Sequence, residues 1–204
     1  MSPELYIFLI FFVAGIIQGI LEWLPVSSEA FVFIFFILCG IDPYMAILLA
    51  MAYHLPTGIA SIIFYRREYL SAIKDIARLR FTPITRYLVV TTIFTSASAI
   101  PLFFLMERIL VEIEKQVERV ALVILLLIGI IMFLTGVLVS KGKPLGTRHI
   151  EESSYSDCIF IGIVQGFSIL PGVSRSGVTI AALLYRRFDG ESSLNGSFIL
   201  SGVV

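Results

Sequence analysis

Apolar residues run continuously over long stretches of the chain instead of alternating with polar ones, and short polar segments separate the stretches. Three of these runs reach the length of about 20 residues that a helix needs to cross a bilayer, and they cover residues 44–65, 87–106 and 120–139. Since continuous apolar runs of this length are typical of membrane-spanning helices, the pattern predicts an all-α integral membrane protein.

Four other apolar runs are too short to cross or are interrupted by polar residues: 5–24, 30–39, 158–170 and 178–185. The first and the third contain a glutamine and stop at a proline, Pro25 and Pro171 respectively. Short apolar helices at membrane depth are typical of re-entrant hairpins. We therefore expect two re-entrant hairpins, at residues 5–39 and 158–187.

The two predicted hairpins are related in sequence. Gly-Ile-Ile-Gln-Gly, beginning at Gly15, returns as Gly-Ile-Val-Gln-Gly at Gly162, and Leu-Pro and then Val-Ser follow in both copies. Three predicted spans lie between the copies, so the second hairpin should enter the membrane from the opposite face. Such an inverted-topology repeat brings its interrupted helices together near the midplane, where they mark the binding site.

The repeat divides the chain into two units. Residues 1–140 hold the first hairpin and three spans, residues 141–154 form a loop, and residues 155–204 hold the second hairpin and the start of a further span at 197–204. By symmetry the second unit should continue for about 80 residues. We therefore expect the chain to be a fragment, or a shortened relative, of a longer protein.

Composition supports a membrane protein and excludes other classes. The chain has 204 residues, of which 58% are apolar and 15% are charged, whereas soluble domains have about 45–50% and about 25%. Its 15 basic and 15 acidic residues cancel, so no basic excess indicates a nucleic-acid partner. Cys39 and Cys158 stand alone in apolar runs and indicate no disulfide framework.

The short loop after the first predicted span, residues 66–80, carries five basic and two acidic side chains. Positive charge beside a span favours the cytoplasm. The first hairpin would then open to the outside of a multi-pass protein of the cell membrane. Residues 107–119 are charged and roughly balanced, which indicates a solvated loop or a surface helix.

Polar side chains inside the first hairpin are candidates for chemistry. Gln18 and Glu22 are four residues apart and share one helix face. A carboxylate within an apolar stretch is costly to bury, so Glu22 is either a functional residue or a carboxylate that reaches interfacial water. Ser27 and Ser28 suit the N-cap of the following helix, and Glu29 suits its first turn.

The second hairpin carries a loop, residues 171–179, that combines glycines, hydroxyls and one arginine. The glycines let the backbone approach a ligand, and the loop leads into a helix N-terminus, which favours an anion. Arg175 is the only lysine or arginine between Arg148 and Arg186. Its planar guanidinium suits phosphate oxygens, although it could instead form a structural pair with Glu22. The glycine and hydroxyl candidates are Gly172, Ser174, Ser176, Gly177 and Thr179.

Together these residues predict a site for a phosphate ester and a divalent cation. The carboxylate of Glu22 can bind Mg²⁺ or Ca²⁺, which prefer oxygen ligands, and the cation and Arg175 would offset charge on the phosphoryl group. His54 lies inside the first predicted span, where we expect it to be buried and hydrogen-bonded beside a kink at Pro56. The sequence lacks the common zinc, nucleotide-binding and serine-hydrolase motifs.

Residues 18–28 and 171–179 resemble two motifs of the undecaprenyl-diphosphate phosphatase family, also called the bacitracin-resistance protein family. The first resembles a Glu/Gln-x-x-x-Glu stretch that runs into Leu-Pro-Val-Ser-Ser, and the second resembles a Pro-Gly-x-Ser-Arg-Ser-x-x-Thr loop. The resemblance covers the whole chain, and family members usually continue past position 204 by further spans.

The resemblance implies an integral membrane enzyme that removes the terminal phosphate from a polyprenyl diphosphate, with a divalent cation, at a site that faces outward. It implies that Glu22 and Gln18 bind the metal and move protons, that Ser28 is a nucleophile candidate and that Arg175 is catalytic. The substrate-binding residues would be Gln18, Ser27, Ser174, Ser176, Gly177 and Thr179. The expected partners are the polyprenyl diphosphate and the membrane; a homodimer is compatible with this reading, and no nucleic acid is expected.

One position departs from the family pattern. Family members usually have a histidine, proposed as nucleophile or general base, where this chain has Phe31. Phenylalanine can neither accept a proton nor attack phosphorus. Three interpretations stay open: Ser28 attacks with Glu22 as its base, Glu29 or His54 takes the missing role, or the activity is low.

Two other functions also stay open. Inverted repeats with broken helices are found in transporters, so the chain could move an anionic polyprenyl lipid across the membrane. Phe31 would also fit a catalytically weak protein that binds a lipid diphosphate. Release of phosphate from a polyprenyl diphosphate separates the enzyme from both alternatives.

Overall fold

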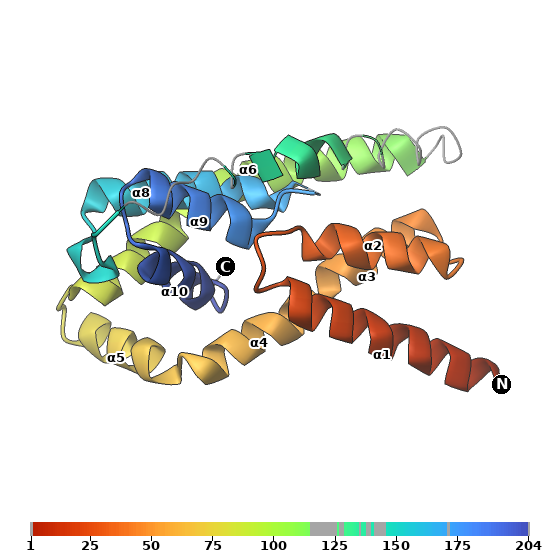
Figure 1. Cartoon of the computed structure of the whole chain (residues 1–204), viewed down its shortest axis with the longest axis horizontal. Coiled ribbons are helices and arrows are strands. Elements are labelled where there is room, and N and C mark those ends of the chain that lie inside the picture. Colours follow the sequence, from red (N-terminus) through yellow and green to blue (C-terminus); the bar gives the residue numbers. More distant parts are fainter. Residues whose placement is uncertain are drawn as a thin grey trace.

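A computed structural model describes residues 2–114, 126, 129–134, 136–137, 140, 146–170 and 172–203. Over these residues the chain is helical, as predicted, and its only β pairing is a bridge between Arg148 and Phe188. The helices are α1 (Pro3–Leu21), α2 (Ser28–Leu38), α3 (Pro43–Ala52), α4 (His54–Phe64), α5 (Arg66–Ala77), α6 (Pro83–Glu114), α8 (Tyr155–Gly166), α9 (Arg175–Tyr185) and α10 (Gly190–Leu200), with 3₁₀ turns η1 (Ile150–Glu152) and η2 (Phe167–Ile169). In Figure 1, α8, α9 and α10 lie between α6 and the pair α4–α5.

Helices α1 and α2 form the first hairpin, and α3 packs against α2. Ser2 and Ser27 cap the two N-termini, since their hydroxyl oxygens accept hydrogen bonds from the backbone N–H groups of Leu5 and Ala30. A buried apolar cluster then joins the three helices: Ile10, Ala14, Ala30, Val32, Phe33, Phe36, Ala46, Ile47 and Ala50. This packing fixes where the last turn of α1 and the first turn of α2 lie.

The structure corrects the prediction for residues 5–24. Helix α1 is continuous over 19 residues and is long and apolar enough to cross a membrane. The polar residues do not interrupt it, because Gln18 lies in its last turn and Glu22 is its C-cap. The apolar part of the helix therefore precedes both polar side chains, which lie together at its C-terminal end.

Two more segments are long and apolar enough to cross a membrane, Pro43–Phe64 and Pro83–Arg108. By length and composition they coincide with the spans predicted at residues 44–65 and 87–106. The predicted span at residues 120–139 falls largely outside the described residues. Many large apolar side chains on the helices are exposed, which is the surface of an integral membrane protein rather than of a soluble one.

The predicted kink at Pro56 is confirmed as a break between α3 and α4 at Tyr53. A proline ring inside a helix clashes with the carbonyl four residues earlier, and for Pro56 that residue is Ala52, where α3 ends. The break places His54 at the first position of α4.

Helices α6 and α8 pack closely through small residues. A Cβ atom added at Gly162 would lie 2.5 Å from the backbone oxygen of Thr91, and one at Gly166 would lie 2.8 Å from that of Thr95. Real Cβ atoms are not found that close to backbone, so both positions need glycine. Small residues spaced four apart commonly bring apolar helices together in membranes, and this contact holds the second hairpin against α6.

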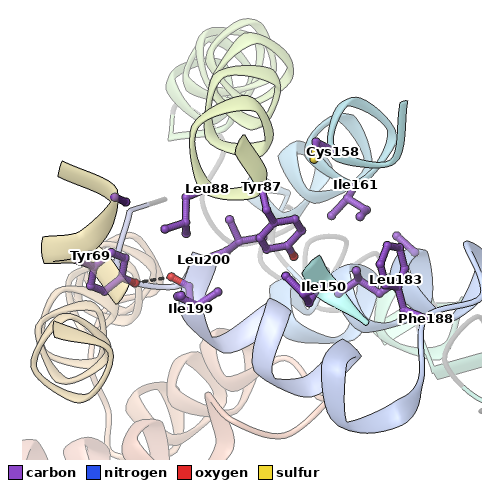
Figure 2. Close-up of a cluster of buried hydrophobic side chains, with 12 residues drawn as sticks. Tyr69, Tyr87, Leu88, Ile150, Cys158, Ile161, Leu183, Phe188, Ile199 and Leu200 are labelled. Carbon is purple, nitrogen blue, oxygen red and sulfur yellow. Dashed lines mark hydrogen bonds between the residues drawn. The ribbon is translucent and has the colours of Figure 1, made fainter. Parts of the chain in front are cut away.

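Residues 66–80, expected to form a loop, contain helix α5, whose Tyr69 and Ala72 are buried while its charged side chains remain outside. The expected span start at residues 197–204 is instead the end of α10, which begins after the N-cap Asp189 and packs into the second buried cluster. Figure 2 shows this cluster, in which the Tyr69 hydroxyl donates a hydrogen bond to the backbone oxygen of Ile199.

Candidate active site

The carboxylate of Glu22 lies at the point where the two hairpins meet. Its side chain is 5% exposed, and both of its oxygens have partners. Arg175, from the second hairpin, places Nη2 2.5 Å from Oε1. On Oε2, the Ser28 hydroxyl donates a hydrogen bond of 2.7 Å and the Gln18 amide Nε2 donates one of 2.8 Å. A buried charge is stable only with such partners, so the four side chains form one interdependent group.

His54 completes this group from α4. Its Nδ1 lies 3.2 Å from Oε2 of Glu22 and 3.3 Å from Nε2 of Gln18. Its side chain is 40% exposed. The sequence predicted a buried histidine, and the structure instead places it half-exposed, with one nitrogen on the carboxylate. The break at Tyr53 produces this position, since it turns the start of α4 toward the C-terminal end of α1.

The N-termini of α2 and α9 both lie beside the Glu22 carboxylate. Ser27 caps α2 and Ser174 caps α9, so that Ser28 and Arg175 are the first residues of their helices. The Ser174 hydroxyl oxygen accepts a hydrogen bond of 3.0 Å from the backbone N–H of Gly177. Because helix N-termini carry free N–H groups and a partial positive charge, their convergence favours an anion.

The remaining predicted hydroxyls hold the two hairpins in place. The Ser176 hydroxyl donates a 2.6 Å hydrogen bond across the interface to the backbone oxygen of Leu24, and it lies 3.2 Å from the Ser174 hydroxyl. The Thr179 hydroxyl donates a 2.7 Å hydrogen bond to the backbone oxygen of Arg175 within its own helix. In this arrangement Ser176 and Thr179 position the loop around Arg175.

A polar pocket of about 30 Å³ lies among these groups. It is lined by Glu22, Val26, Ser27, Ser28, Glu29, His54, Ser168, Val173, Ser174, Arg175 and Ser176. Of the predicted site residues, Gln18, Gly177 and Thr179 do not line it and lie behind those that do. Its volume is close to that of one water molecule, which is too small for a diphosphate group.

Phe31 lies outside this pocket. It is 44% exposed and lines a separate apolar groove between α1 and α2. Glu29, by contrast, lines the polar pocket beside Ser28. The imidazole beside Glu22 is therefore that of His54. The side chain of Phe31 does not enter the polar pocket.

Ser168 also lines the polar pocket, and it is the one serine there that was not predicted from the sequence. The repeat contains the signal that could have found it. Counted back from the shared Leu-Pro, Ser168 occupies the position that Glu22 has in the first copy. Two matching positions of the repeat therefore contribute polar side chains to one pocket.

The described part of the chain offers few ligands for a metal ion. Among the described residues no group of three histidine, cysteine, aspartate or glutamate side chains is arranged to hold one. The amide oxygen of Gln18 is buried beside Glu22 and has no hydrogen-bond partner in this part of the chain. A bare amide oxygen next to a carboxylate fits a hard cation that keeps waters or takes further oxygens from its substrate.

Residues 11–204 match the family described as bacitracin resistance protein BacA. The chain belongs to this family. Relatives named undecaprenyl-diphosphatase include one from Haloarcula marismortui, 36% identical over 196 residues, or 92% of this chain and 70% of the relative. Another from Methanopyrus kandleri is 34% identical over 193 residues, or 93% of this chain and 68% of the relative. One from Methanothrix thermoacetophila is 35% identical over 190 residues, covering 93% and 69%.

Proposed function

We propose that this chain is a membrane-embedded phosphatase that hydrolyses the terminal phosphate of an undecaprenyl-type polyprenyl diphosphate and leaves the lipid monophosphate. One observation carries the proposal: a buried carboxylate joins a serine hydroxyl to an arginine where two helix N-termini meet. Membership in the BacA family and the names of the relatives support the choice of substrate.

The arginine and the helix N-termini would bind the diphosphate. In the resting arrangement Arg175 pairs with Glu22, and the polar pocket has room for about one water. A diphosphate therefore enters by replacing Glu22 as the partner of Arg175. The guanidinium can then form paired hydrogen bonds with two phosphate oxygens, while the N-termini of α2 and α9 add N–H groups.

Ser28 would attack the terminal phosphorus. Its hydroxyl already donates to Oε2 of Glu22 at 2.7 Å, so the proton passes to that carboxylate as the Oγ–P bond forms and the bridging P–O bond breaks. The polyprenyl monophosphate leaves with the bridging oxygen. Water then hydrolyses the phosphoserine, releasing phosphate and restoring the hydroxyl. His54, 3.2 Å from the same oxygen, relays the proton from Glu22 to water.

A divalent cation, Mg²⁺ or Ca²⁺, would be held by Glu22 and by the bare amide oxygen of Gln18, with the diphosphate supplying further ligands. When bound, such a cation neutralises charge on the phosphoryl oxygens. We also propose that the two hairpins form an inverted-topology repeat with the polar pocket open to the outside of the cell membrane. The shared sequence motif and the basic residues of α5 support this arrangement.

The test is phosphate release from a polyprenyl diphosphate by the purified chain, with and without EDTA. We expect release that EDTA abolishes and that added Mg²⁺ or Ca²⁺ restores. Movement of intact lipid diphosphate across a vesicle without release of phosphate would contradict the proposal and favour a transporter. If EDTA leaves the release of phosphate unchanged, the proposed role of a divalent cation is wrong, while the proposed phosphatase activity stands.

A further inference from the structure

A second, much larger cavity adjoins the polar pocket. It has a volume of about 880 Å³, within the range of cavities that bind small molecules. Its walls come mainly from apolar side chains of α3, α4 and α6, among them Met51, Leu55, Ile59 and Phe103. We call it the apolar cavity.

The apolar cavity and the polar pocket share two residues, Glu29 and His54. These two side chains therefore lie at the boundary between the polar pocket, which suits a phosphate group, and the apolar cavity, which suits hydrocarbon. The groove between α1 and α2 that Phe31 lines is also apolar, with a volume of about 400 Å³, but shares no residue with the polar pocket. Of these two apolar spaces, only the apolar cavity shares lining residues with the polar pocket.

We infer that the apolar cavity holds the isoprenoid units next to the diphosphate, while the rest of the prenyl chain continues into the bilayer. The inference rests on the proposed function and adds the place of the tail. A diphosphate bound at Arg175 and Ser28 is covalently joined to hydrocarbon, which must leave the polar pocket across the boundary at Glu29 and His54. A prenyl chain gains little hydrophobic free energy when it moves from the bilayer into an apolar protein cavity. The cavity would therefore discriminate among lipids by the shape of the prenyl chain.

Ile59 is the residue best placed to test the cavity. It lines the cavity and is 50% exposed, so a larger side chain can be accommodated without disturbing buried packing. Ile63 lies one turn further along α4, is 60% exposed and does not line the cavity. The two isoleucines therefore allow the same substitution, to tryptophan, inside and outside the cavity on one helix.

Kinetics distinguish the two positions. We expect Ile59→Trp to raise KM for a long-chain polyprenyl diphosphate by about tenfold with kcat unchanged, because the lost contacts are equally present in ground state and transition state. Ile63→Trp should stay within about twofold of the unmodified chain, the range expected of a change that removes no binding contact. Equal effects of the two substitutions, or a fall in kcat alone with Ile59→Trp, would overturn the inference.

Photolabelling tests the cavity without turnover. A polyprenyl diphosphate with a photoreactive diazirine in its first isoprenoid unit should label peptides containing Leu55, Ile59 or Phe103, and excess unlabelled lipid should prevent it. Label in the groove near Ile20 and Ile34, or spread over outward helix faces, would overturn the inference. Absence of phosphate release by the unmodified chain would defeat the proposed function alone, because the position of the label does not depend on hydrolysis.

Discussion

At the scale of single residues, the buried carboxylate of Glu22 organises the site. Arg175, Ser28, Gln18 and His54 all lie within hydrogen-bonding distance of its two oxygens. Loss of Arg175 would leave this charge without its ion pair in an apolar environment. Loss of Ser28 would still leave Oε2 with Gln18 and His54 as partners. Substitutions at these partners therefore need a measurement of stability as well as of activity.

Arg175 should be irreplaceable by lysine. Arg175→Ala is expected to lose activity, and Arg175→Lys should fail to restore it, because an ammonium keeps the charge but lacks the planar fork that holds two phosphate oxygens. Phosphate release by both variants checks this expectation, with the unfolding temperature as control for the lost ion pair. Full activity of the lysine variant would show that a point charge is sufficient.

Glu22→Gln should change the dependence on metal as well as the rate. The amide keeps the shape of the side chain and removes the charge that we propose a cation shares with the bare oxygen of Gln18. We therefore expect a higher concentration of Mg²⁺ or Ca²⁺ for half-maximal phosphate release, together with a lower maximum. If only the maximum falls, Glu22 acts in proton transfer and does not bind the metal.

Substitutions at His54 and at Phe31, the position where family members usually have a histidine, should have very different effects on kcat. His54→Gln should lower kcat by at least about tenfold, since the imidazole 3.2 Å from Glu22 is the group that we propose relays the proton from Glu22 to water. Phe31→Ala should leave kcat nearly unchanged, because Phe31 lines the groove between α1 and α2. A large loss with Phe31→Ala and none with His54→Gln would reverse these assignments.

Much of the residue-scale picture could be predicted from sequence. The helical spacing of Gln18 and Glu22 and the motifs around Ser28 and Arg175 predicted that these side chains lie close together, and the structure places the other three within hydrogen-bonding distance of Glu22. The place of His54 could not be predicted, because it depends on the direction that α4 takes after its break. The two apolar spaces could not be predicted either, since they arise only from packing between helices.

At the scale of elements, the two copies of the repeat use the same glycines differently. Gly162 and Gly166 pack tightly on α6, whereas a Cβ at Gly15 would lie 3.5 Å from the Tyr53 ring, and one at Gly19 would have nothing within 4 Å. The matching glutamines differ too, since Gln165 accepts a hydrogen bond from Thr95 while Gln18 donates to Glu22. Sequence similarity shows the repeat, and packing shows that the glycines and glutamine of the second copy contact α6.

Alanine substitution at matched positions should expose this difference. Gly162→Ala should destabilise the protein by about 1–3 kcal/mol, the cost of forcing a methyl group into close-packed backbone. Gly15→Ala should be neutral or slightly stabilising, because the methyl group has ordinary contact distance and alanine favours a helix. Unfolding of both variants in the same detergent checks this, and equal stability would argue against the α6–α8 contact.

At the scale of the whole molecule, the site exists only because the two halves meet. Glu22, Ser28 and His54 come from the first predicted unit and Arg175 from the second, and the Ser176–Leu24 hydrogen bond joins the hairpins beside them. The chain spans about 70% of the length of the three relatives named above. Both motifs of the resemblance nevertheless lie within it, so the site can be tested on this chain.

The proposed hydrolysis requires Ser28, Glu22 and Arg175 to act together, with Ser28 as nucleophile. The decisive measurement is phosphate release from a polyprenyl diphosphate by the unmodified chain and by Ser28→Ala in the same membrane preparation. We expect a loss of at least about a hundredfold with an unfolding temperature close to that of the unmodified chain. Near-full activity of Ser28→Ala would contradict serine attack and indicate a water activated beside Glu22.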